Sequence, residues 1–120
     1  MNGQVDLQGR ALLTVLIRTA PDATTSPVEV WIDTGFTGEL VMPRSQIDNL
    51  GLKPGLMVRA VLADGRESRL KTFVAWIDWF GETLEVEVVA GESETALMGV
   101  GLMLGRQLFV DYETLNLTLD

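Results

Sequence analysis

The sequence predicts an all-β fold, a small closed or partly closed β-barrel with one or two short helices. Apolar and polar residues alternate with a period of two in four segments, 11–17, 28–32, 83–89 and 114–120. Turn-forming residues separate these segments at 20–27, 63–67 and 91–93. Many short strands joined by frequent turns are typical of small β-barrels. The 120 residues show no linker or internal repeat, and we expect a single domain over 1–120.

Two short helices are expected between the strands. The first follows the second strand, with Pro43 at its first position, apolar residues on a common face and Gly51 just past its end. The second is expected from Gly99 to about Leu104. Neither is long enough to cover a sheet, so the strands must form most of the core.

A β-hairpin is expected at 61–70, where Asp64 and Gly65 favour a tight turn with positive φ at the tip. A run rich in aromatic residues follows it. We expect this run to pack in the core and to place Asp78 in a turn. The last alternating segment, 114–120, reads as a strand with one buried face.

Composition excludes several kinds of function. Nine Lys and Arg against seventeen Asp and Glu give a net charge of −8, which repels the phosphate backbone of nucleic acids. The chain has no Cys and no His, so disulfides, the usual zinc ligands and Ser-His or Cys-His catalysis are absent. We expect no metal and no cofactor. No apolar run is long enough to insert in a membrane, and we expect a soluble, cytoplasmic protein.

The tripeptide Asp33-Thr34-Gly35 ends the second predicted strand directly after apolar residues. A carboxylate in such surroundings is costly unless it is hydrogen-bonded or functional. Asp and Gly also suit an ordinary turn, so a purely structural role remains open. Acid–base chemistry at this point needs a second carboxylate, because one carboxylate cannot both activate a water and protonate a leaving nitrogen. No second Asp-Thr-Gly occurs in the chain, so the partner must be the Asp33 of an identical chain around a two-fold axis.

Three stretches follow one another around and after this tripeptide: WIDTGFTGELVMP at 31–43, SQIDNLGL at 45–52 and ALMGVGLMLG at 96–105. Their order and spacing resemble those of the retropepsin-like aspartic proteases, in particular the small single-domain bacterial members. The resemblance implies the retropepsin-like acid protease fold and a homodimer in which each chain contributes half of the site. It also implies that the terminal strands are exchanged between the two chains.

The resemblance assigns roles to individual residues. Asp33 is then the catalytic acid, and Thr34, Gly35 and Gly99 support the site. Thr34 is expected to lock the two loops across the dimer axis, and Gly35 allows close approach. Hydrolysis of a peptide bond by a water shared between two Asp33 carboxylates is the implied activity.

The substrate implied by the resemblance is a polypeptide in extended conformation that binds as an added strand. The hairpin 61–70 lies where the family carries its flap. The residues expected to contact the substrate come from the catalytic loop and from the flap tip; they are Phe36, Thr37, Ala63, Asp64 and Gly65.

Two positions depart from the family's pattern. Phe36 replaces a small residue, and it either walls a substrate pocket or crowds the site. Gly101 stands where Asp or Asn is frequent, so a supporting side-chain hydrogen bond is missing. Two alternatives to a protease therefore remain: a peptide-binding module with little turnover, and an unrelated β-barrel in which Asp33 only shapes a turn.

Overall fold

The structure is a computed structural model that describes residues 1–61 and 64–120. Within these residues, twelve strands, one α-helix and one short 3-10 helix follow one another along the chain. In order they are β1 (Asn2–Val5), β2 (Ala11–Arg18), β3 (Ser26–Ile32), β4 (Leu40–Pro43), α1 (Arg44–Leu50), β5 (Lys53–Pro54), β6 (Val58–Val61), β7 (Glu67–Leu70), β8 (Thr72–Trp79), β9 (Glu82–Gly91), β10 (Ala96–Met98), η1 (Val100–Leu102), β11 (Leu108–Asp111) and β12 (Asn116–Leu119).

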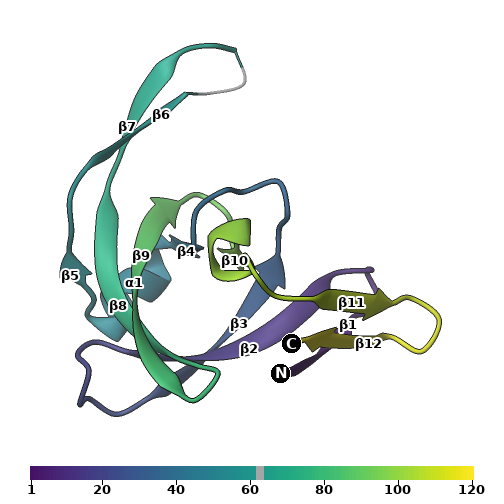
Figure 1. The fold of residues 1–120 in the computed structure, drawn as a ribbon. Helices are drawn as coiled ribbons and strands as arrows, with labels where there is room; N and C mark the ends of the chain where they lie inside the picture. The colour runs from purple at the N-terminus through teal and green to yellow at the C-terminus, as the bar shows by residue number, and fades with distance from the viewer. Residues whose placement is uncertain (62–63) are drawn as a thin grey trace.

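Six strands close into a barrel in the order β2-β3-β10-β4-β9-β8 (Figure 1). The barrel closes because the end of β2 also pairs with β8, where Ile17 lies opposite Ile77. This confirms the predicted all-β barrel. The four alternating segments correspond to β2, β3, β9 and β12.

Strand β10 lies between β3 and β4, parallel to the first and antiparallel to the second. Met98, the last residue of β10, lies opposite Ile32, the last residue of β3. Parallel strands end at the same edge of a sheet. The segments that follow β3 and β10 therefore leave the barrel side by side, and these are the two loops that carry Asp33 and Gly99.

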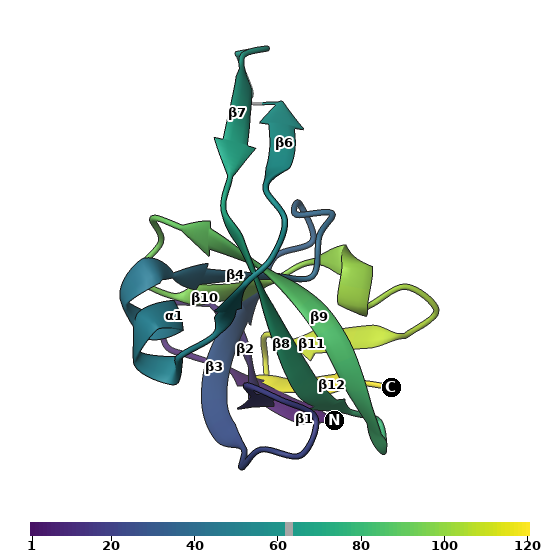
Figure 2. The same cartoon turned by 90° about the vertical axis from the view of Figure 1, so that its left-hand side faces the viewer.

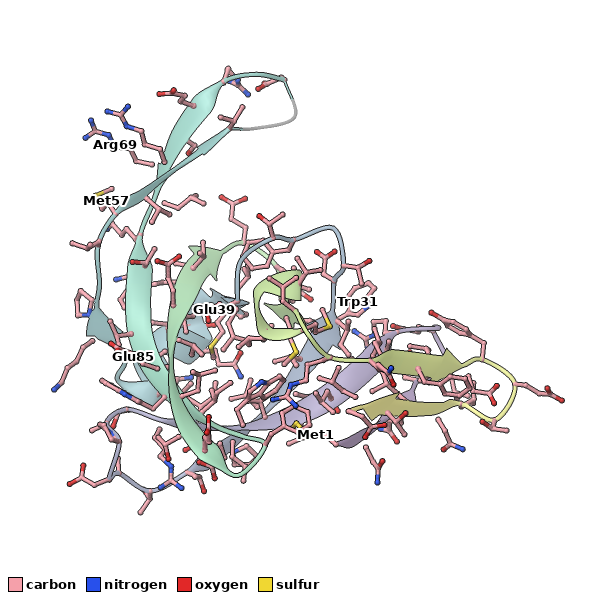
Figure 3. All side chains as sticks on the ribbon, in the orientation of Figure 1. Met1, Trp31, Glu39, Met57, Arg69 and Glu85 are labelled. Carbon is pink, nitrogen blue, oxygen red and sulfur yellow. The ribbon has the colours of Figure 1, made fainter. Side chains whose placement is uncertain are left out.

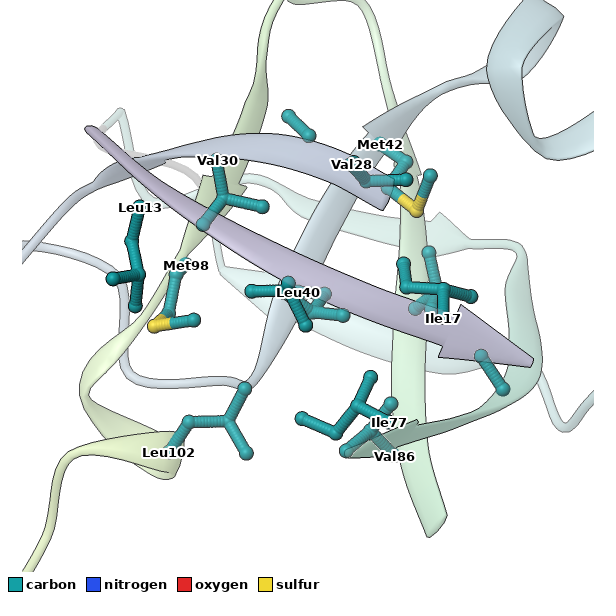
Figure 4. Close-up of a cluster of buried hydrophobic side chains, with 14 of the residues drawn as sticks. Leu13, Ile17, Val28, Val30, Leu40, Met42, Ile77, Val86, Met98 and Leu102 are labelled. Atoms are coloured by element: carbon teal, nitrogen blue, oxygen red, sulfur yellow. The ribbon is translucent and has the colours of Figure 1, made fainter. Parts of the chain in front are cut away.

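The barrel interior is filled by aliphatic side chains from alternate positions of its strands (Figure 4). On β9, for example, Val86 and Val88 are buried while Glu85 and Glu87 are exposed. Each fully buried side chain of this size contributes roughly 1.5 to 3 kcal/mol. The side chains with the least exposure include Leu13, Val15, Ile17, Val30, Leu40, Met42, Ile77, Val88 and Met98.

The first predicted helix is α1, and it ends as expected at Gly51, whose φ of 75° is left-handed. Pro43 is the residue before the helix, with φ −59° and ψ 142°, and not its first turn as expected. Its extended ψ follows from its place at the end of β4, which pairs with β9. The second predicted helix is limited to the single turn of η1.

The predicted hairpin consists of β6 and β7, which pair only with each other among the described residues and project away from the barrel (Figure 2). Gly65 has the positive φ expected near its tip, 85°. The expectation for Asp78 was wrong, because this residue belongs to β8 and its carboxylate accepts hydrogen bonds from Arg18 at 3.0 and 3.2 Å. The turn after β8 is formed instead by Phe80 and Gly81.

The chain ends form a small sheet, β11-β12-β1, that continues from β2 and extends beyond the barrel. Strand β12 has β1 on one side and β11 on the other, both from the same chain. Both edges of β12 are therefore paired in the single chain that the structure contains. The expected exchange of terminal strands between two chains stays a prediction.

Candidate active site

Asp33 is the first residue after β3, and backbone hydrogen bonds fix its place. Its N–H donates to the carbonyl oxygen of Met98 at 2.8 Å, and its carbonyl accepts from the Phe36 N–H at 3.2 Å. Its side-chain Oδ1 accepts from the N–H of Gly35 at 2.9 Å, the turn bond that the sequence allowed. No described residue donates to Oδ2. The half-buried carboxylate thus keeps one oxygen available.

Three backbone hydrogen bonds join the loop after β10 to the loop after β3. The N–H groups of residues 99, 100 and 101 donate to the carbonyls of Glu39, Phe36 and Gly38 at 2.9, 2.8 and 3.0 Å, respectively. These bonds join the two loops through backbone groups alone. The hydrogen bond missing from the Gly101 side chain is replaced by one from its own N–H.

Close packing of the two loops explains why glycine occupies two of these positions. A Cβ on Gly99 would lie no more than 2.6 Å from the carbonyl oxygens of Gly38 and Phe36. A Cβ on Gly101 would lie 2.8 Å from the carbonyl oxygen of Gly38. Contacts this short essentially do not occur, so neither position accepts a side chain without a shift of the backbone.

The Phe36 ring packs back on its own loop. Its atoms would meet a Cβ placed on Gly38 or on Gly99, so the ring covers the backbone of both loops. Among the described residues, a hollow of about 320 Å³ beside Asp33 is lined by Trp31, Ile32, Asp33, Ser93 and Leu97, and Phe36 is not part of this lining.

Four of these residues were not expected at the site: Trp31, Ile32, Ser93 and Leu97. Trp31 lies two residues before Asp33, on the same face of the chain, and it lies opposite Leu97 in the parallel pairing of β3 with β10. The period of two along a strand was the signal that could have placed Trp31 beside Asp33. No such local signal exists for Leu97, because its place at the hollow depends on the register of β10 with β3.

Trp31 is 39% exposed and lies on the side of the barrel from which the terminal sheet extends (Figure 3). The Arg10 guanidinium lies over the indole, with Cζ 5.8 Å from the ring centroid. Arg10 is itself held by Asp6, with Nε 2.7 Å from Oδ2. Hydrogen bonds from the Arg10 backbone N–H, then from its side chain, lower the pKa of Asp6, so the carboxylate stays charged and keeps Arg10 in place.

The remaining predicted residues lie apart from this hollow. Thr34 and Thr37 are exposed on the loop after β3. Asp64 and Gly65 belong to the projecting hairpin, where Asp64 Oδ2 lies 2.5 Å from Arg66 Nε. Ala63 lies outside the described residues.

The hairpin is anchored at its base. Gly55 donates its N–H to the carbonyl oxygen of Thr72 at 2.8 Å, and the buried Thr72 hydroxyl donates to the carbonyl oxygen of Leu56. On the hairpin, Val58 and Leu70 form a cross-strand pair that is partly buried, while the neighbouring pair Arg59 and Arg69 is exposed. At its base the hairpin therefore has an apolar pair on one face and two arginines on the other, and the face of the arginines continues with Val61 and Glu67.

Two further findings concern the whole described part of the chain. None of its helices is long and apolar enough to cross a lipid bilayer. No group of three or more Asp or Glu side chains in residues 1–61 and 64–120 is arranged to hold a metal ion.

No protein-family model matches the sequence, and no curated protein matches it either. Solved structures do match. A retropepsin-like aspartic protease from Rickettsia conorii has a TM-score of 0.65 at 15% identity, over 99% of this chain and 88% of that one. The EIAV protease in complex with the inhibitor HBY-793 has a TM-score of 0.56 at 21% identity, over 88% and 97%.

The protease of simian foamy virus gives a TM-score of 0.54 at 17% identity, over 78% of this chain and 91% of that one. These structures match over most of their length, although few residues are identical. The similarity therefore concerns the fold, that is, the overall arrangement of the strands. The chain has the fold of the retropepsin-like aspartic proteases.

Proposed function

We propose that this protein is a homodimeric aspartic endopeptidase, in which each chain is a single domain that contributes one Asp33 to a shared site. The observation that carries the proposal is the position of Asp33. Backbone bonds hold it at the joined loops of a retropepsin-like fold, with one carboxylate oxygen available beside a hollow of about 320 Å³.

A second chain is needed because one chain does not supply a second acid next to Asp33. Among the described residues, Asp33 is the only acid that lines this hollow. A two-fold axis beside the loop after β3 would bring the two Asp33 carboxylates together. Thr34, which is exposed in one chain, would then contact the same loop of the partner.

Two carboxylates brought together at such an axis share one proton. The ionised carboxylate takes a proton from a water molecule while the water oxygen attacks the peptide carbonyl carbon, and the protonated carboxyl gives its proton to the carbonyl oxygen. In the second step the C–N bond breaks. The leaving nitrogen takes a proton from the dyad, and a hydroxyl of the intermediate returns one to it. The products are a carboxylic acid and an amine, and the dyad again holds one proton.

The substrate we propose is a polypeptide in extended conformation, bound by backbone hydrogen bonds as an added strand. Phe36 and Thr37 on the loop, and Ala63, Asp64 and Gly65 on the hairpin, are the residues we assign to substrate contact. The apolar pair Val58 and Leu70 supports a role of the hairpin as a flap, because apolar side chains that close over a peptide exclude water.

A peptide-binding module with little turnover is the second candidate. The position of Phe36 is the observation in its favour, since the ring covers the loop backbone that in an open site would be free for a substrate. Both candidates predict peptide binding, and only the protease predicts cleavage that depends on Asp33.

The test is cleavage of a diverse peptide mixture, read by mass spectrometry, for the wild type, for Asp33→Asn and for Asp22→Asn. Asp22 lies exposed in the turn before β3 and provides a matched control for the same chemical change. The protease predicts that Asp33→Asn abolishes cleavage while Asp22→Asn leaves it unchanged, and that the rate rises faster than linearly with protein concentration. Binding without cleavage by the wild type would support the module instead.

A further inference from the structure

We propose that the outer face of the β6–β7 hairpin binds an acidic segment of a partner protein. This face consists of the side chains of Met57, Arg59, Arg69 and Lys71. Figure 3 shows Met57 and Arg69 on one side of the hairpin, the side away from Trp31 and its hollow. A segment bound there is not the one presented to Asp33, so the proposal does not depend on peptide cleavage.

The period of two along the hairpin places these four side chains together. Arg59 and Arg69 lie directly opposite each other in the antiparallel pairing of β6 with β7, so their side chains leave on the same face. Met57 precedes Arg59 by two residues and Lys71 follows Arg69 by two, so both continue this face toward the base of the hairpin. All four side chains are exposed.

Positive charge is concentrated in this part of an acidic chain. Residues 53–71 hold five of the nine Lys and Arg but only two of the seventeen Asp and Glu. Their formal charge is therefore +3, whereas the other residues together carry −11. Anionic groups are attracted to the hairpin and repelled by the rest of the molecule, which confines their binding to the hairpin.

The two arginines of the outer face lack the carboxylate partners that other arginines have. Ion pairs within the chain hold Arg10, Arg18, Arg44 and Arg66. Within residues 1–61 and 64–120, no carboxylate forms an ion pair with Arg59 or Arg69, although Glu67 lies on the same face. Like charges directly opposite in an antiparallel pair repel each other. A bound carboxylate would remove this repulsion by accepting hydrogen bonds from both guanidinium groups.

An apolar hollow lies at the base of the outer face. It has a volume of about 270 Å³, and its lining includes Arg44, Pro54, Met57, Lys71 and Phe73. The Arg44 guanidinium lies over the Phe73 ring, with Cζ 5.1 Å from the ring centroid. The hollow thus combines apolar side chains with two cationic groups. This combination fits an apolar side chain that has carboxylates beside it in the sequence.

These features define the chemistry of the partner. Side chains two residues apart in an extended segment point the same way and lie about 6 to 7 Å apart. The same spacing separates Arg69 from Lys71 along the hairpin. An extended segment with acidic residues at alternate positions can therefore place its carboxylates on these cations and a following apolar side chain in the hollow. A nucleic acid fits less well, because its long polyanionic backbone is repelled by the −11 charge of the remaining residues.

The test is binding of a fluorescein-labelled peptide that alternates glutamate with serine and ends in phenylalanine. Fluorescence anisotropy measures the affinity at low and at high salt. Every protein carries Asp33→Asn, so cleavage of the peptide cannot affect the signal. Arg69→Gln should weaken binding about threefold, and its combination with Arg59→Gln about tenfold, through the loss of exposed ion pairs. High salt should weaken binding in the same direction.

Arg106→Gln is the matched control, because it removes the same charge elsewhere. Arg106 lies between η1 and β11, with its guanidinium over the ring of Phe80 in the turn after β8. This variant should bind the peptide as the unchanged protein does. A peptide with glutamine in place of glutamate should not bind, and one with serine in place of phenylalanine should bind several-fold more weakly.

Thermal unfolding separates a binding role from a structural one. Arg69→Gln removes the repulsion within the cross-strand pair, so its melting temperature should equal or exceed that of the unchanged protein. A clear decrease would show that the arginine pair stabilises the hairpin, and it would remove the main reason for expecting a partner. Circular dichroism confirms that each variant is folded.

The other outcomes decide between partners. Equal weakening by Arg69→Gln and Arg106→Gln would indicate attraction to the protein as a whole and overturn the proposed surface. Tighter binding of a single-stranded oligonucleotide than of the peptide would overturn the choice of partner. So would a dimer that light scattering shows to be lost in the double variant, because the occupant would then be a second copy of the chain. Absence of peptide binding at low salt overturns the proposal outright.

Discussion

Replacing Gly99 by alanine tests how tightly the two loops that carry the site are joined. The new methyl group would lie no more than 2.6 Å from two backbone carbonyl oxygens, those of Gly38 and Phe36. Backbone atoms cannot turn away as a flexible side chain can, so the loops must separate. Overpacking of this kind costs about 1 to 3 kcal/mol, and loss of the bond from the Gly99 N–H to Glu39 adds about 1 kcal/mol. We expect a loss of about 2 to 4 kcal/mol.

Urea unfolding followed by circular dichroism measures this loss, and Gly35 and Gly101 provide a graded comparison. A Cβ on Gly35 meets only Asp33 Oδ1, at 3.2 Å, and we expect Gly35→Ala to cost less than about 1 kcal/mol. A Cβ on Gly101 meets the carbonyl of Gly38 at 2.8 Å and should give an intermediate loss. Equal midpoints for Gly99→Ala and Gly35→Ala would refute the idea that close approach of the loops constrains the sequence.

Three further changes give separate expectations. Leu40→Ala removes a side chain with 0% exposure from the barrel and should cost about 2 to 5 kcal/mol in urea unfolding. Hydrogen bonds from the backbone N–H groups of Glu113 and Thr114 lower the pKa of Asp111. The stability that these bonds contribute is therefore present above about pH 4 and is lost as the pH falls through the pKa of the folded state. Asp111→Asn removes this titration and should make the melting temperature fall less steeply at acidic pH. Gly65→Ala strains a turn with φ 85° and should both slow peptide cleavage and slightly lower the melting temperature.

The sequence predicted those strands that have one solvent-exposed face and are long enough for the alternation of apolar and polar residues to be visible. Strand β9 is the clearest case, because the buried Val86 and Val88 alternate with the exposed Glu85 and Glu87. Strand β10 has only three residues, Ala96–Met98, too few for a period to be visible. Its position between β3 and β4 depends on pairings that are distant in the sequence. The prediction for Asp78 was wrong for a related reason. Asp is typical of turns, but here it lies in β8, where its carboxylate binds Arg18, a partner sixty residues away.

In the candidate site, too, the sequence predicts the residues that have a local signal and misses those that depend on long-range pairing. Asp33, Gly35 and Gly99 could be found from the sequence, because turn chemistry and the resemblance both point to local stretches. The hollow beside Asp33 could not, since Leu97 reaches it only through the register that places it opposite Trp31.

The two departures from the family pattern, Phe36 and Gly101, belong to one arrangement of the loops. The loops are joined by three backbone bonds, so a side-chain hydrogen bond from position 101 is not required to hold them. With the N–H of Gly101 bonded to Gly38 at 3.0 Å, a side chain there has no room. The Phe36 ring covers the backbone of Gly38 and Gly99, which shields these bonds from water and strengthens them. A polar residue at position 101 would therefore need a different loop, not only a different side chain.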